Sequence, residues 1–104
     1  MWDYPPDTPP ITVGTLLIDW DRAVVTMEGK PVPFSWTEIS LLAALAHAHG
    51  RVLSRAWLID AIWQNEDRNH DHLKNIVGQT RRKLGPEAWR LKTVVGMGYR
   101  LDCD

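Results

Sequence analysis

The order of apolar and polar residues along the chain first predicts a small antiparallel sheet. Strand-like apolar content occupies residues 12–20 and 23–27, and a Glu-Gly-Lys sequence at 28–30 is typical of a hairpin turn before residues 31–34. The two prolines in that last segment restrict it to an edge strand or a short bridge, because proline has no amide hydrogen to donate. We therefore expect a short meander of strands before the first helix.

Two helices are predicted next. Ser35 and Glu38 have the spacing of a capping box and Gly50 is a natural C-terminal cap, so residues 36–49 should form a helix. Ser54 caps a shorter helix over residues 55–63. The expected buried residues of the first helix are Ile39, Leu42, Leu45 and Ala46, and those of the second are Leu58, Ala61 and Ile62. Residues 64–68 are polar and are predicted to be a loop.

Segment 69–84, NHDHLKNIVGQTRRKL, predicts a third helix with two different faces, which Gly85 and Pro86 end. The apolar stripe that should anchor it comprises Leu73, Ile76, Val77, Thr80 and Leu84. The opposite stripe carries Asp71, Lys74, Asn75, Gly78 and Arg82, with Gln79 and Arg81 at its edges. Most of these are side chains that hydrogen-bond to base edges and phosphates, so we place the function on this helix.

A terminal hairpin completes the pattern. Residues 91–94 and 99–103 flank the glycine-rich segment Val95-Gly96-Met97-Gly98. A small sheet, three helices and a hairpin in this order predict an α+β fold of the winged helix-turn-helix type. With 104 residues, of which 44% are apolar, one domain is expected. We expect it to span residues 11–104, after a flexible proline-rich tail or linker at 1–10.

Charge is unevenly distributed, although the formal net charge is only -1. Residues 1–67 hold four basic and nine acidic residues, whereas residues 68–100 hold eight basic and two acidic residues. A basic C-terminal third on an acidic body is typical of a protein that binds a polyanion. A solvated charged face without a ligand is the alternative interpretation.

Other site chemistries are disfavoured. The single cysteine, Cys103, excludes an intramolecular disulfide and gives no zinc pattern, which fits a reducing cytoplasm without a cofactor. His47 with His49, and His70 with His72, are two residues apart and point in different directions on a helix, which disfavours a metal site. No catalytic or nucleotide-binding motif and no membrane-spanning or targeting segment is present. We therefore predict a non-enzymatic cytoplasmic protein without a membrane partner.

Four segments together resemble the OmpR/PhoB-type DNA-binding domain, the usual effector half of bacterial two-component response regulators. These segments are GRVLSR at 50–55, LIDAIW at 58–63, RRKL at 81–84 and TVVGMGYRL at 93–101. The resemblance covers about residues 14–102. It implies a transcription regulator that binds double-stranded DNA, with the third helix in the major groove and the hairpin wing near the minor groove.

The resemblance also implies individual contacts. Trp63, Arg81, Thr93 and Tyr99 would touch the DNA backbone, while Lys74, Asn75, Gly78 and Gln79 would occupy base-reading positions, which favours a site containing adenine. His72 is a candidate donor to a phosphate beside Arg81. The complete set of expected DNA-binding residues is Trp63, Arg68, His72, Lys74, Asn75, Gln79, Arg81, Arg82, Thr93 and Tyr99. RNA polymerase, another regulator protein and a homodimer on tandem sites are further partners left open.

Departures from the family pattern define the alternative. Val95 stands where the family commonly has a wing arginine, and Gly78 stands where a longer polar residue is common. These differences allow a winged-helix protein-protein interaction module with a degenerate DNA surface, in which Trp57 would be a contact if it is exposed rather than packed against the N-terminal sheet or Arg55. A chain of this length has no room for a receiver domain, so it is expected to be an isolated effector half or a stand-alone protein.

Overall fold

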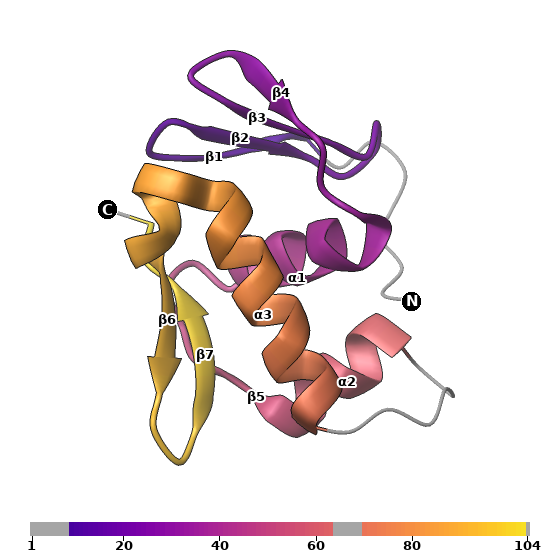
Figure 1. Ribbon diagram of the computed structural model, residues 1–104, viewed down its shortest axis with the longest axis vertical. Helices are drawn as coiled ribbons and strands as arrows, with labels where there is room; N and C mark the ends of the chain where they lie inside the picture. Colours follow the sequence, from indigo (N-terminus) through magenta and orange to yellow (C-terminus); the bar gives the residue numbers. More distant parts are fainter. Residues whose placement is uncertain (1–8, 64–69, 104) are drawn as a thin grey trace.

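The computed structural model describes residues 9–63 and 70–103, so the predicted loop at 64–68 and most of the predicted tail lie outside the described residues. These described residues form a four-stranded antiparallel sheet, three α-helices and a second, three-stranded sheet that includes the terminal hairpin (Figure 1). The predicted order of sheet, helices and hairpin is therefore confirmed for the described part of the chain.

The N-terminal sheet has one more strand than the sequence predicted. Its strands, in spatial order, are β1 (Ile11–Val13), β2 (Leu16–Asp19), β3 (Val24–Met27) and β4 (Lys30–Val32). The prediction of a single strand over residues 12–20 was wrong, because Gly14 adopts a φ of 58° and the chain turns there between β1 and β2. The predicted turn at Glu28 and Gly29 is confirmed, with φ values of 52° and 79°. As expected, β4 is an edge strand.

Helix α1 (Trp36–His47) forms the centre of the core. Its capping box is confirmed, since the Glu38 amide donates to Ser35 Oγ at 3.2 Å and the Ser35 amide donates to Glu38 Oε1 at 2.7 Å. All of its predicted stripe is buried. The predicted C-terminal bound was two residues too late, because the left-handed conformation begins at His49, with a φ of 52°, before Gly50.

Helix α2 (Arg55–Trp63) begins as predicted, with the Trp57 amide donating to Ser54 Oγ at 3.1 Å. Leu58 and Ile62 are buried, and Ala61 is half-buried. The preceding strand β5 (Leu53–Ser54) was not predicted, because two residues joined directly to a helix give no periodic signal.

Helix α3 (His70–Leu84) buries the predicted stripe, with Leu73, Val77, Thr80 and Leu84 inside the core and Ile76 half-buried. Gly85, with a φ of 55°, ends the helix as predicted. The chain then continues as a short 3-10 helix, η1 (Gly85–Arg90), which the sequence analysis missed.

The terminal hairpin consists of β6 (Leu91–Val94) and β7 (Gly98–Leu101), and β7 also pairs with β5. Gly98 permits this pairing, since a Cβ there would lie 2.0 Å from the Leu53 carbonyl oxygen. In Figure 1 the hairpin runs beside α3 with its tip toward the start of that helix, while the N-terminal sheet covers the other end of α3. The described residues contain no helix long and apolar enough to span a bilayer.

Candidate nucleic-acid interface

The solvent side of α3 presents the polar stripe that the sequence predicted. We call this surface the outer face; it comprises Asp71, Lys74, Asn75, Gly78, Gln79 and Arg82, which line a hollow of about 440 Å³. All are exposed except Gly78, which is half-buried. Because the opposite stripe is held in the core, α3 can offer these side chains to a ligand without rearranging.

A second hollow, of about 480 Å³, lies between α2, α3 and the hairpin. It is lined by Arg55, His70, Asp71, Lys74, Val77, Gly78, Arg81, Thr93 and Tyr99. The guanidinium carbon of Arg55 lies 5.9 Å from the centre of the Tyr99 ring, so a cation covers an aromatic residue that is only 5% exposed. Sequence reasoning did not include Arg55 or His70 in the site. No local sequence pattern identifies Arg55, because its contact with Tyr99 joins segments far apart in the chain.

Arg81 fastens the hairpin to α3. Its Nε donates to the Leu91 carbonyl oxygen at 2.9 Å, and its Nη2 donates to Thr93 Oγ1 at 2.9 Å. The structure therefore brings Arg81, Thr93 and Tyr99, three of the residues that the resemblance assigned to the DNA backbone, to one hollow. These contacts make Arg81 a positioning residue for the wing, which the sequence did not indicate.

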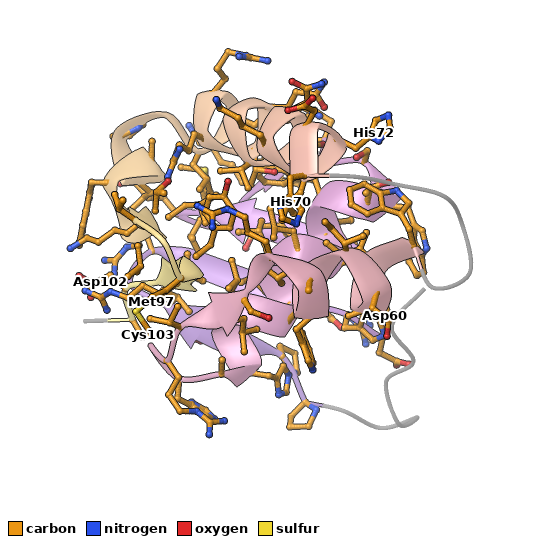
Figure 2. All side chains as sticks on the ribbon, turned by 90° about the horizontal axis from the view of Figure 1, so that it is seen from below. Asp60, His70, His72, Met97, Asp102 and Cys103 are labelled. Atoms are coloured by element: carbon orange, nitrogen blue, oxygen red, sulfur yellow. The ribbon has the colours of Figure 1, made fainter. Side chains whose placement is uncertain are left out.

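His72 lies on the other side of α3. It lines a separate hollow of about 240 Å³ together with Thr37, Trp63, Asn75 and Ile76. His72 and Arg81 line different hollows, because nine residues along a helix turn a side chain to the opposite side, and a contact between His72 and a phosphate stays a prediction. Figure 2 shows His72 pointing outward, away from Met97 at the wing. Arg68 lies outside the described residues.

Several cations of the basic C-terminal third are paired with carboxylates of the fold. We call three contacts the structural ion pairs: Lys83 Nζ to Glu38 Oε1 at 2.6 Å, Arg90 Nε to Glu87 Oε2 at 2.7 Å, and Lys92 Nζ to Asp102 Oδ2 at 3.0 Å. Arg90 also donates from Nη1 to the Asp102 carbonyl oxygen at 3.1 Å. The segment count therefore overstated the charge available to a polyanion.

Glu38 is the most deeply buried of the paired carboxylates, with a side chain 1% exposed. Burial raises its pKa, but hydrogen bonds from Lys83 and from Ser35 outweigh burial and hold the pKa below the ordinary value of 4.5. Lys83 also donates to the Pro33 carbonyl oxygen at 3.0 Å. The end of α3 is thus tied to the start of α1, which orients the outer face.

Several large apolar side chains are exposed outside the outer face. Trp57 is 44% exposed, as the alternative function required, and lies in a hollow lined by Ala44, His47 and Ala48 at the end of α1. The residues that line this hollow include neither Arg55 nor any residue of the N-terminal sheet. At the wing tip, Val95 is 90% exposed and Met97 is 60% exposed.

His70 and His72 do not converge on a common site. His70 and His72 line different hollows, as their spacing predicted, and the described residues contain no cluster of three metal-ligating side chains. Cys103 is half-buried, with its Sγ 3.4 Å from the Leu101 carbonyl oxygen that accepts its hydrogen bond.

The arrangement of α2 and α3, followed by a hairpin that α3 holds beside its own exposed face, defines a winged helix-turn-helix protein. The family model described as "Transcriptional regulatory protein, C terminal" matches residues 29–101. The chain belongs to this OmpR/PhoB-type family, which confirms the resemblance drawn from the four sequence segments.

Named relatives agree with this assignment. The transcriptional regulatory protein CseB of Streptomyces coelicolor is 35% identical over 92 residues, which cover 88% of this chain and 38% of CseB. The DNA-binding domain of CpxR from E. coli is 28% identical with a TM-score of 0.79, covering 90% of this chain and 96% of that one. The RstA DNA-binding domain of Klebsiella pneumoniae, solved in complex with the RstA box, superposes with a TM-score of 0.81 at 24% identity. The match covers 93% of this chain and 100% of that one, and it shows the shared fold.

Proposed function

We propose that this chain binds double-stranded DNA in a sequence-specific manner and acts, without catalysis or cofactor, in bacterial transcription regulation. The observation that carries the proposal is the outer face of α3, a polar surface opposite a buried stripe and beside a fastened wing. An α-helix of about 10–12 Å diameter fits the major groove, which is about 12 Å wide. With α3 in the major groove, the hairpin β6–β7 lies near the adjacent minor groove.

Three side chains of the outer face are assigned to the base edges. Asn75 and Gln79 carry amides that can bond to adenine through two hydrogen bonds, and Lys74 can donate to guanine. Each good pair contributes about 1–3 kcal/mol of discrimination against the wrong base. A site that contains adenine follows from this set of donors and acceptors.

The remaining predicted residues are assigned to the DNA backbone. Arg82 is exposed at the outer face, and the guanidinium of Arg81 has five N–H donors, of which the two bonds to the hairpin use two. Both can donate to phosphates. Trp63, Arg68, His72, Thr93 and Tyr99 complete the proposed backbone contacts.

The comparisons support the proposal at the level of the family. CpxR, whose domain is named for DNA binding, shares the fold at 28% identity, and CseB is named a transcriptional regulatory protein. This chain spans about two fifths of the length of the CseB relatives, with 38% and 40% covered. Action in the cytoplasm, contact with RNA polymerase or another regulator, and dimerisation on tandem sites are parts of the proposal. The exposed polar state of the outer face gives no support to the alternative of a degenerate interaction module.

The test compares selected DNA with random DNA. Duplexes are selected from a random pool by the wild-type chain, and affinities are measured by fluorescence anisotropy for wild type and for the variant Lys74→Ala/Asn75→Ala/Gln79→Ala. Loss of several base contacts should weaken binding to the selected site by about 100-fold or more, with little change on random DNA.

A matched control removes one positive charge from the N-terminal sheet instead of from the outer face. Thr12 and Lys30 are exposed on the N-terminal sheet, so Thr12→Ala/Lys30→Ala should bind like wild type. Equal affinity of the wild type for selected and random DNA would overturn the proposal, as would equal losses in the two variants.

A further inference from the structure

Gly78 lies at the centre of the outer face. It is one helical turn from Lys74 on one side and one turn from Arg82 on the other, and it lines both hollows that flank this face. Glycine is the poorest helix former after proline, so a glycine in the middle of a fifteen-residue helix weakens α3. Its presence there therefore requires a reason.

The fold itself supplies no such reason. A Cβ at Gly78 would meet, as its nearest neighbour, the tip of the Arg82 side chain at 3.9 Å, which is an ordinary contact. Gly14 and Gly98 differ, since a Cβ would lie 2.0 Å from Arg90 Nη2 at the first and 2.0 Å from the Leu53 carbonyl oxygen at the second. Close backbone packing explains Gly98 and the positive φ of 58° explains Gly14, whereas at Gly78 the space left by the missing side chain opens to solvent.

The chemistry of this gap is apolar. Gly78 has no side-chain donor or acceptor, and its amide hydrogen is used within the helix, so it offers a ligand only a short Cα surface. Lys74, Asn75, Gln79 and Arg82 surround it with polar groups. The major groove presents one apolar group among its donors and acceptors, the 5-methyl group of thymine. A methyl group seated at Gly78 would let the surrounding side chains reach the neighbouring base edges.

We propose that Gly78 determines specificity by receiving a thymine methyl group against the backbone of α3. This inference rests on the proposed binding of α3 in the major groove. It assigns to one thymine of the DNA site a contact that depends on the absence of a side chain.

The experiment is a cycle between one protein change and one DNA change. In the selected duplex, each thymine is replaced in turn by uracil, which removes the methyl group and keeps the Watson–Crick pairing. For wild type, one position should lose about fourfold in affinity, the value expected for one methyl-sized apolar contact. In Gly78→Ala the new methyl group occupies the same space, so thymine DNA should bind more weakly and uracil at that position should recover the affinity.

Two controls separate this effect from others. Urea unfolding should show Gly78→Ala to be at least as stable as wild type, so lost binding is not lost folding. Thr12→Ala, at the exposed position of β1, should give the wild-type uracil profile.

The outcomes separate the inference from the proposed function. Selected-site binding with the same uracil profile in wild type and Gly78→Ala overturns the role of Gly78 and leaves the proposed function standing. Absence of any preference for selected DNA overturns both.

Discussion

The outer face of α3 and the structural ion pairs at its other end use the same residue types for different purposes. Lys83, Arg90 and Lys92 are bound to carboxylates, and the Arg90 side chain is 8% exposed. Lys74 and Arg82 extend from the outer face and form no ion pair with the described residues. A count of charges along the sequence combines these two groups. Only the second group is available to a polyanion, while in the first group Lys83 ties α3 to α1.

The largest effect is expected from breaking the buried ion pair. Glu38→Gln removes the charge that Lys83 meets, and loss of one partner of a buried pair costs about 3–5 kcal/mol. Because the Lys83 side chain is 37% exposed, water screens part of this loss, and we expect a decrease of about 2–3 kcal/mol in the free energy of unfolding, measured in urea. Glu28→Gln, at an exposed turn, is the matched control and should change it by less than about 0.5 kcal/mol. Equal effects of the two substitutions would show that the pair does not hold the fold.

A smaller effect is expected at the wing. Arg81→Lys cannot keep both bonds to Leu91 and Thr93, because an ammonium lacks the planar fork of a guanidinium. We expect the free energy of unfolding to fall by about 1 kcal/mol and amide hydrogen exchange in β6 to accelerate. The same change at exposed Arg82 should leave both quantities unaltered. Protection of β6 that is identical in the two variants would contradict the positioning role of Arg81.

A substitution at the wing tip should change DNA affinity rather than the free energy of unfolding. Val95→Arg places a cation at a position that is 90% exposed, so the free energy of unfolding should stay within about 0.5 kcal/mol. A new phosphate contact should raise DNA affinity by about threefold to tenfold at low salt and steepen the salt dependence by about 0.9. Val95→Gln, a polar control without charge, should leave the salt dependence as it is. An unchanged slope for Val95→Arg would place the wing tip away from DNA.

The smallest effect is expected in the free energy of unfolding at acidic pH. The pKa of Glu38 is lowered from 4.5 because hydrogen bonds outweigh burial, and the pKa of Glu87 is lowered chiefly by hydrogen bonds from Thr15 and Arg90. A lowered folded pKa means that the unfolded state binds protons first, so stability is full above pH 4.5 and falls as the pH drops below it. Urea midpoints between pH 6 and pH 3 should fall less steeply in Glu38→Gln than in wild type. Parallel curves would contradict the contribution of Glu38.

Much of the fold could be predicted because its signals are local. The capping box at Ser35, the apolar stripe of α3 and the turn at Gly29 each depend on residues close in sequence. Strand β5 was missed because it depends on a distant partner, its pairing with β7. The break between β1 and β2 is local, at the positive φ of Gly14, but the apolar content continues past it and predicted one strand. Residues 85–90 were interpreted only as the end of a helix, and their 3-10 conformation was not foreseen.

For the candidate site, as for the fold, the sequence predicted features that lie within one helix and missed contacts between distant segments. Helical periodicity identified every member of the outer face, because that face depends on one helix alone. The same periodicity places His72 and Arg81 on opposite sides of α3. The bonds of Arg81 to the hairpin, the place of Arg55 over Tyr99 and the pairing of Lys83 with Glu38 join segments far apart in the chain. No periodic pattern contains such contacts.

The most direct test of DNA binding through the outer face is the salt dependence of affinity in two charge-matched variants. Arg82→Gln removes the outer-face cation that is assigned to the DNA backbone, and Arg22→Gln removes a cation from the exposed turn between β2 and β3. If Arg82 meets one phosphate, the slope of log affinity against log salt should become shallower by about 0.9 in the first variant and stay at the wild-type value in the second. Equal slopes in the two variants would contradict the account.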